Sequence, residues 1–179
     1  MTFNFGVDEK IKSHARHNGD RTVFVSMDET VTYQSLYEFV QVFEKDCLGA
    51  GLIKKSPVIV YLSDSLMQAK VLSSLFFLQI PGLLMAETTK AEEIIRLSKD
   101  YPFSGVITDH KFSPKIKEGL LEARGTKNGQ LTFFSFSNPA QVDFSWLLHT
   151  SGSTGRPKMV MLSSQNLQER TLGEVGLFK

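Results

Sequence analysis

VIVYLSDSLMQAKVLSSLFFLQIPGLLMA, residues 58–86, reads as a strand, a helix and a second strand joined by short turns. The run VIVYL is apolar without alternation, which is typical of a strand buried on both faces of a sheet. Ser63 or Asp64 caps the helix, which we predict to reach about Gln79. Gly82 then begins a second apolar run, LLMA, that we predict as a strand. This order of elements favours parallel strands in an α/β sheet.

The same alternation continues on both sides of that stretch. Thr32 precedes a run with apolar residues at helical spacing, which Gly49 and Gly51 end. The other predicted elements are a strand at 22–27, a helix at 91–100, a strand at 104–108, a helix at 114–123, and strands at 131–136, 144–150 and 159–162. We therefore expect an α/β fold with a mostly parallel sheet flanked by helices.

Residues 124–130, RGTKNGQ, are rich in glycine and polar side chains, so we expect a flexible connector there. The segment is too short to predict a domain boundary. With 179 residues, 41% of them hydrophobic, the chain is long enough to bury a core, and its length favours one domain. We therefore treat residues 1–179 as one unit.

The charge and the cysteine content argue against some classes of binding partner and cellular location. Lys and Arg number 20 against 19 Asp and Glu, a net charge of +1, so no strong field favours nucleic acid or an anionic membrane. The single cysteine, Cys47, has no disulfide partner in the chain and is interpreted as a packing residue, which suits the cytoplasm. The N-terminus lacks the apolar core of a signal peptide. The most apolar run, 71–86, is too broken to form a membrane span of ~20 residues.

A loop of hydroxyls, glycines and a lysine follows the last long strand: TSGSTGRPK, residues 150–158. Glycines allow backbone N–H groups to approach a ligand closely, hydroxyls donate hydrogen bonds, and lysine supplies a positive charge. A polyphosphate uses all of these groups together. The Walker P-loop does not fit, because Pro157 separates the last glycine from Lys158, Met159 replaces the Ser or Thr, and a strand is predicted to follow instead of a helix.

The loop resembles the phosphate-binding signature of the adenylate-forming (AMP-binding) superfamily, which includes acyl-CoA synthetases, fatty-acyl-AMP ligases, luciferases and peptide-synthetase adenylation domains. Thr150 to Lys158 agree with it at every position, whereas Met159 stands where glycine is usual and Ser163–Ser164 where Thr-His is common. The segment VTYQSLYEF, from Val31, is similar to the family's first helix. The resemblance covers essentially the whole chain but only the N-terminal part of the family fold, so it implies an N-terminal subdomain of an AMP-binding domain.

The resemblance implies activation of a carboxylic acid by ATP, with Mg²⁺, as an acyl-adenylate. Transfer to a thiol of coenzyme A or of an acyl or peptidyl carrier protein would follow. No catalytic residue and no metal ligand is assigned within these 179 residues. The residues that would hold the ATP phosphates are Thr150, Ser151, Gly152, Ser153, Thr154, Gly155 and Lys158. The alternative is a truncated or degenerate nucleotide-binding or interaction module without catalysis.

Several other residues have a structural and a functional interpretation. His14 and His17 are spaced for a metal pair but lack a third ligand, so we expect surface residues. His149 precedes the loop and either touches a ligand or fills space at a strand end. Trp146 is interpreted as a core residue and not as a platform for base stacking.

Overall fold

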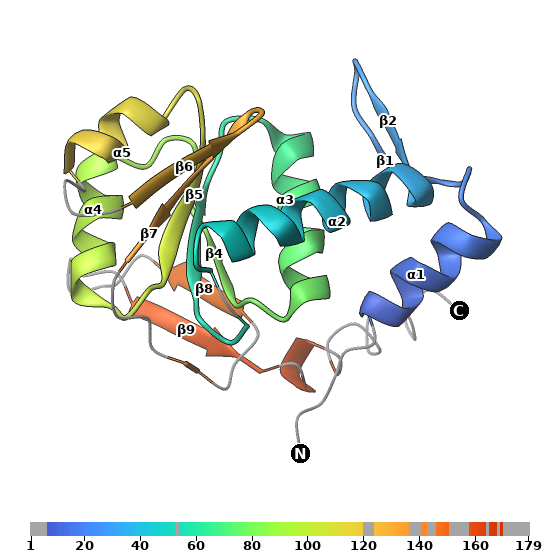
Figure 1. Cartoon of the computed structure of the whole chain (residues 1–179). Coiled ribbons are helices and arrows are strands. Elements are labelled where there is room, and N and C mark those ends of the chain that lie inside the picture. The colour runs from blue at the N-terminus through green and yellow to red at the C-terminus, as the bar shows by residue number, and fades with distance from the viewer. Residues whose placement is uncertain are drawn as a thin grey trace.

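The computed structural model describes residues 7–52, 54–119, 124–136, 141–142, 146–150, 158–163, 165–167 and 169 (Figure 1). Its elements alternate between helices and strands, as the sequence predicts. In chain order they are α1 Val7–His17, β1 Thr22–Val25, β2 Thr30–Thr32, α2 Tyr33–Gly49, β3 Val58–Tyr61, α3 Ser65–Leu78, β4 Gly82–Leu84, α4 Ala91–Asp100, β5 Gly105–Asp109, α5 Ser113–Gly119, β6 Arg124–Asn128, β7 Leu131–Ser135, β8 Trp146–Thr150 and β9 Lys158–Leu162.

The described strands form one large sheet and one small hairpin. The seven-stranded sheet has the order β6-β7-β5-β3-β4-β8-β9, and β1 pairs with β2 separately. Strands β5, β3, β4 and β8 run parallel to one another, whereas β7 joins β5, β6 joins β7 and β9 joins β8 in antiparallel fashion. The expected α/β fold with a mostly parallel sheet flanked by helices is confirmed.

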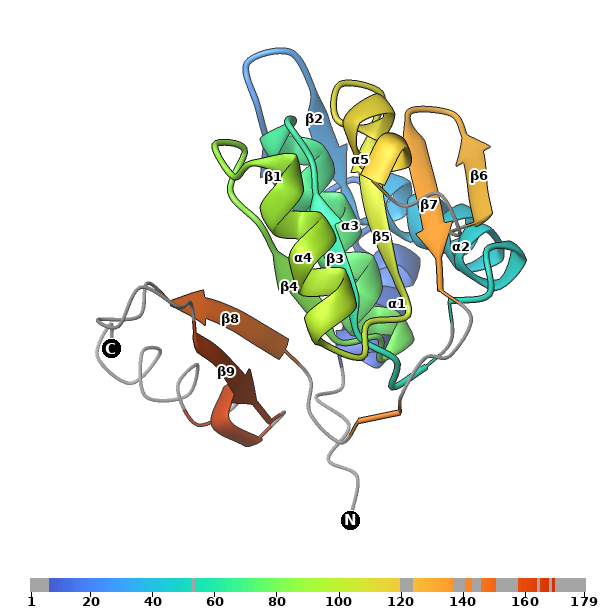
Figure 2. The same cartoon turned by 90° about the vertical axis from the view of Figure 1, so that its left-hand side faces the viewer.

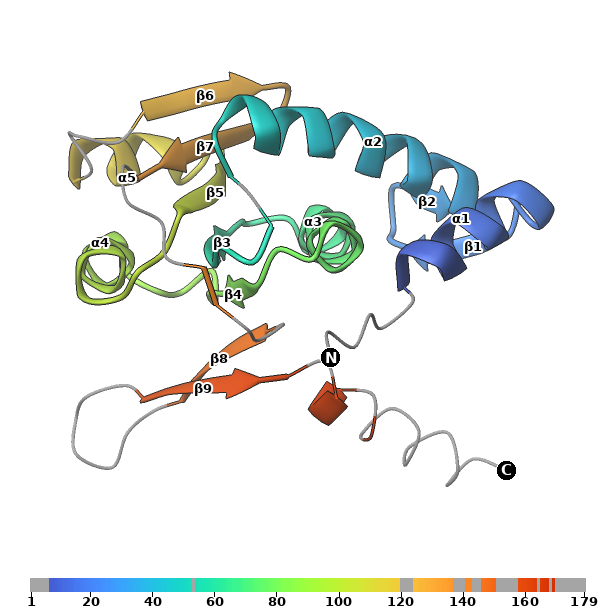
Figure 3. The same cartoon turned by 60° about the horizontal axis from the view of Figure 1, so that its bottom comes forward.

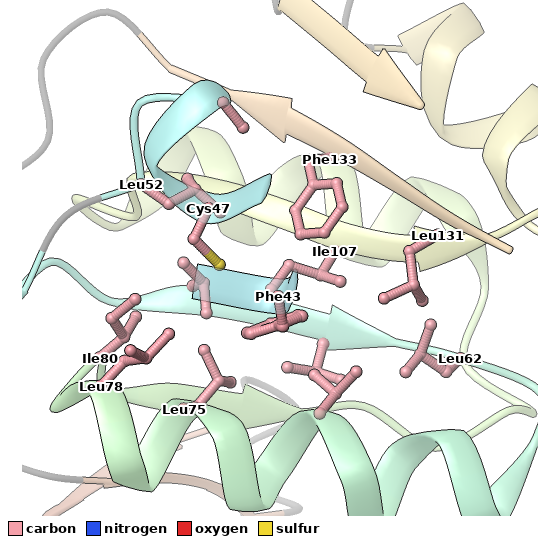
Figure 4. Close-up of a cluster of buried hydrophobic side chains, with 14 residues drawn as sticks. Phe43, Cys47, Leu52, Leu62, Leu75, Leu78, Ile80, Ile107, Leu131 and Phe133 are labelled. Atoms are coloured by element: carbon pink, nitrogen blue, oxygen red, sulfur yellow. The ribbon is translucent and has the colours of Figure 1, made fainter. Parts of the chain in front are cut away.

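Helices cover both faces of the sheet (Figures 2 and 3). One buried cluster lies between α2, α3 and the sheet, and Figure 4 shows Phe43, Leu75 and Phe133 meeting there. Cys47 is buried in the same cluster, so the prediction of a packing residue is confirmed. A second cluster, which includes Ile94 and Ile116, fills the space between the other face and α4 and α5. Alternate residues of β3 enter opposite clusters, which is why its sequence is continuously apolar.

Side-chain caps fix the start of two helices. Thr32 accepts a hydrogen bond from the Ser35 backbone N–H, and the Ser35 side chain accepts one from the Thr32 N–H, which is a capping box for α2. Asp64, not Ser63, caps α3 by accepting a hydrogen bond from the Met67 N–H. These polar residues therefore determine where each helix begins.

The expected connector at 124–130 is wrong. Arg124–Asn128 is strand β6, which pairs antiparallel with β7 from Arg124↔Ser135 to Asn128↔Leu131. Gly129, with φ +56°, begins the tight turn between the two strands. The polar composition concealed a hairpin strand because β6 occupies the edge of the sheet, where polar residues are common. The sequence analysis also did not predict α1 or β2.

Trp146 joins β8 to the rest of the sheet. Its ring is buried and stacks on Phe76, with 4.8 Å between the ring centroids, so the core interpretation is confirmed. A Cβ at Gly82, its partner on β4, would come within 2.8 Å of the indole ring. Only glycine therefore fits under this ring without displacement. In the part of the chain that the structure describes, no helix combines the length and apolar character needed to cross a membrane.

Candidate nucleotide-binding site

The predicted phosphate-binding loop lies between β8 and β9. These strands pair antiparallel from Trp146↔Leu162 to Thr150↔Lys158, so the ends of the loop meet as backbone partners. Ser151, Gly152, Ser153, Thr154 and Gly155 fall within 151–157, outside the described residues. A strand follows Lys158, as predicted, so the loop does not open a helix in the manner of a Walker P-loop.

The hairpin formed by β8 and β9 ends at the carboxyl edge of the sheet. β8 runs parallel to β4, with Gly82 opposite Trp146 and Leu83 opposite Leu147. β3 and β5 run in the same direction as β4, so the carboxyl ends of all four strands lie on one side. Ligands of open α/β sheets bind outside this edge, so the two ends of the loop lie where a ligand can bind.

Asp109 connects the carboxyl ends of β3 and β5. One of its oxygens, Oδ2, accepts hydrogen bonds from the Ser63 N–H at 2.6 Å and the Ser63 hydroxyl at 2.7 Å. The other, Oδ1, accepts from the N–H groups of Lys111 at 3.0 Å and Phe112 at 3.2 Å. Burial acts to raise the pKa of Asp109, but these hydrogen bonds outweigh it and lower the pKa below its ordinary value. The hydrogen bonds therefore favour the anionic form of the carboxylate, which fixes two turns at this edge.

Tyr61, at the end of β3, lies beside this connection. Its ring stacks on Phe112 with 4.0 Å between centroids, and its hydroxyl donates a hydrogen bond to the Thr89 carbonyl oxygen at 2.5 Å. Burial, with nearby Asp109 and Glu87, raises the pKa of the Tyr61 hydroxyl. The phenol is therefore held neutral, as a donor that fixes the segment after β4.

An open hollow of about 1080 Å³ lies between α4 and α5 at the same edge. Tyr61, Phe112 and Ile95 give it an apolar wall, and Lys115 and Glu118 lie at its charged side. Glu87 also lines it and forms an ion pair with Lys111. The sequence analysis missed these residues because they come from separate elements. The available signal was limited to Glu87 and Phe112, which follow the ends of β4 and β5.

In the folded chain His149 lies beside the carboxylate of Glu93, which the sequence pattern did not indicate. Its Nε2 is 3.6 Å from Glu93 Oε1 in the first turn of α4, and the side chains are 19% and 32% exposed. This distance is suitable for an ion pair but is longer than a hydrogen bond. His149 therefore faces the first turn of α4.

His14 and His17 have separate environments on α1. The His14 ring stacks on Tyr33 with 4.6 Å between centroids, whereas His17 is exposed and its Nδ1 is 2.9 Å from the Ser13 carbonyl oxygen. Among the residues that the structure describes, no three His, Cys, Asp or Glu side chains gather in a group suited to a metal ion. His14 is partly buried, which differs from the expected surface position.

Comparison with known proteins adds a family to this geometry. A family model described as AMP-binding enzyme matches residues 11–176. The chain belongs to the AMP-binding enzyme family. It is 26% identical to the D-alanine--D-alanyl carrier protein ligase of Bacillus licheniformis, over 91% of this chain and 33% of that protein. It is 22% identical to the 2-succinylbenzoate--CoA ligase of Bacillus mycoides, over 82% of this chain and 31% of that protein.

Solved structures of adenylate-forming enzymes share the fold of this AMP-binding chain. The o-succinylbenzoate CoA synthetase of Bacillus subtilis, in complex with its acyl-adenylate intermediate, matches with a TM-score of 0.62 at 19% identity, over 84% of this chain and 40% of that one. A long-chain-fatty-acid-CoA ligase from Archaeoglobus fulgidus matches with a TM-score of 0.70 at 18% identity, over 96% and 39%. The chain spans about a third of the length of the curated relatives it matches.

Proposed function

We propose that this AMP-binding chain supplies the ATP phosphate-binding part of a ligase that activates a carboxylic acid as an acyl-adenylate. The observation that carries the proposal is the antiparallel β8–β9 pair, which brings the two ends of TSGSTGRPK together at the carboxyl edge of the sheet. Membership of the AMP-binding enzyme family supports ATP as the ligand. The single buried thiol, Cys47, agrees with the cytoplasmic location that we propose.

The loop would act by binding the phosphates and neutralising their negative charge. Its backbone N–H groups and hydroxyls donate hydrogen bonds, and the Lys158 ammonium adds positive charge. Mg²⁺ would arrive with the phosphates, since it keeps several waters and binds through few protein ligands. The proposed contacts are made by Thr150, Ser151, Gly152, Ser153, Thr154, Gly155 and Lys158.

The proposed reaction has two steps. A substrate carboxylate oxygen bonds to the α-phosphorus of ATP, and pyrophosphate leaves with the bridging oxygen and its electron pair. A thiolate then attacks the acyl carbon, and AMP leaves. The carboxylate is already a nucleophile, so the first step needs positioning and charge stabilisation and not a general base. The relatives named for CoA and for a carrier protein support these two classes of thiol acceptor.

The test is exchange of labelled pyrophosphate into ATP, measured with a panel of carboxylic acids. It uses the complete product of the reading frame that encodes the chain, because exchange is not expected of residues 1–179 alone. We expect acid-dependent exchange that Lys158→Ala lowers by about 100-fold. Lys117→Ala on α5, an exposed lysine far from the loop in sequence, is the matched control and should leave exchange unchanged. Unchanged kinetics in Lys158→Ala would remove Lys158 from its assigned role.

The second candidate function is a nucleotide-binding or interaction module without catalysis. One observation favours it: Met159 follows the loop lysine at a position where the family usually has glycine. MgATP binding by folded protein without exchange for any acid would support this candidate. Acid-dependent exchange would exclude it.

A further inference from the structure

The β8–β9 hairpin has two halves that differ in their attachment. In its inner half, Trp146 and Leu147 of β8 pair with Gly82 and Leu83 of β4. In its outer half, β8 continues through Leu148, His149 and Thr150, and among the described strands only β9 pairs with these residues. The outer half, which carries the loop ends, therefore depends on side chains to hold it against the rest of the molecule.

The two faces of the outer half are not equivalent. Leu148 and Val160 are cross-strand partners on one face, and each is 41% exposed. His149 and Met159 are cross-strand partners on the other face. Met159 packs against the buried cluster under α4 and α5, and His149 reaches Glu93 on α4. Figures 1 and 3 show the loop ends of β8 and β9 on the side of the molecule where α4 lies.

The contact between His149 and Glu93 joins the hairpin to α4 at a partly buried position. Both side chains are partly buried, so solvent screens their attraction less than it would screen a surface pair. His149 Nε2 is itself buried and has no hydrogen-bond partner among the described residues, and it faces the Glu93 carboxylate at 3.6 Å. The other ion pairs found within the described ranges do not involve the hairpin, whereas His149–Glu93 links it to a helix.

We propose that His149 is a positioning residue for the phosphate-binding loop. Through Glu93 it holds the outer half of the hairpin against the first turn of α4, and so fixes where the paired residues Thr150 and Lys158 lie at the two ends of the loop. This inference rests on the proposed function, because it assigns His149 a role in the binding of the same ligand.

Two measurements on the 179-residue chain test this role. Amide hydrogen exchange reports how firmly Leu148, His149, Met159 and Val160 are held. Titration with MgATP reports the effect on the loop. The variants are His149→Ala, Glu93→Ala and the two combined, with His149→Gln as the conservative form. Glu92→Gln is the matched control, because it changes the adjacent, exposed carboxylate on the same turn of α4.

We expect either alanine variant to speed amide exchange in the outer half and to weaken MgATP binding by about three- to tenfold. The double variant should bind no more weakly than the single ones, because both remove the same interaction. His149→Gln, whose amide can still donate to Glu93, should recover most of the affinity, and Glu92→Gln should match the unaltered chain. Thermal unfolding checks that each variant is folded. If an alanine variant does not fold, His149→Leu and Glu93→Leu, which occupy the space without a polar group, carry the comparison.

The outcomes separate this inference from the proposed function. If Lys158→Ala weakens MgATP binding but the His149 and Glu93 variants bind normally, the positioning role is wrong and the proposed function stands. Additive losses in the double variant would also overturn the positioning role. If the folded, unaltered chain does not bind MgATP at millimolar concentration, the proposed function is overturned and the positioning role with it.

Discussion

The carboxyl edge of the sheet has a firmly connected region and a lightly connected one. At the ends of β3 and β5, Asp109 is 5% exposed and accepts four hydrogen bonds from two turns. At the end of β8, His149 has one charged partner at 3.6 Å. Buried, satisfied carboxylates stabilise a fold, whereas a segment with few contacts is free to adjust to a ligand. This edge therefore combines two regions. One is a rigid platform, formed by Asp109 and the turns that it holds after β3 and β5, and the other is the adjustable β8–β9 hairpin.

The largest effect on the platform should come from Asp109→Ala. Removing the carboxylate leaves buried N–H donors of the two turns without an acceptor, which we expect to lower the free energy of unfolding by about 3 kcal/mol. Urea unfolding measures this change. Asp100→Ala, at the exposed end of α4, is the matched control and should have little effect. A loss under about 1 kcal/mol in Asp109→Ala would mean that the two turns do not depend on this carboxylate.

The next largest loss of stability is expected where β4 meets β8 of the hairpin. Gly82→Ala would place a Cβ 2.8 Å from the Trp146 ring, and we expect a loss of about 2 kcal/mol in unfolding free energy from overpacking. Trp146→Leu in the same chain should recover part of that loss by making space. Gly49→Ala is the control, because nothing lies within 4 Å of its added Cβ. Equal stability of the Gly82 and Gly49 variants would contradict the close packing described here.

Acid should weaken the platform through Asp109. Its pKa is lowered in the folded chain, so the unfolded state binds the proton more readily and the stabilisation exists above the unfolded pKa. That stabilisation is lost as the pH falls through the folded pKa. Urea midpoints from pH 7 to pH 3 should therefore converge for the unaltered chain and Asp109→Asn. A constant difference between the two across this range would show that the charge of Asp109 does not matter.

The smallest effect is expected on the outer face of the hairpin. Val160→Thr changes a half-exposed residue opposite Leu148 and should alter the unfolding free energy by less than about 0.5 kcal/mol. The same substitution at Val60, which is fully buried in β3, should cost much more because it buries a hydroxyl in an apolar cluster. Similar losses at both positions would remove the distinction between the two regions.

Local sequence signals explain which features were predictable. The continuous apolar run of β3 and the cap at Thr32 each depend on a few neighbouring residues, so the sequence alone indicates them. Phosphate binding by 150–158 stays a prediction. β6 was missed because its strand character comes from pairing with β7 and not from its own composition. Ser63–Asp109 and His149–Glu93 join residues far apart in the chain, and only the parallel order of the strands brings them to one edge.

The central claim, that residues 150–158 hold the phosphates of ATP, is tested most directly by mapping MgATP on the chain by NMR. Backbone amide shifts are followed during titration of the unaltered chain and of Lys158→Ala. We predict that the largest shifts fall at 150–158, with smaller ones at His149 and Glu93, and that Lys158→Ala reduces them at equal MgATP concentration. Large shifts confined to other elements, or identical titrations for the two chains, would contradict the account.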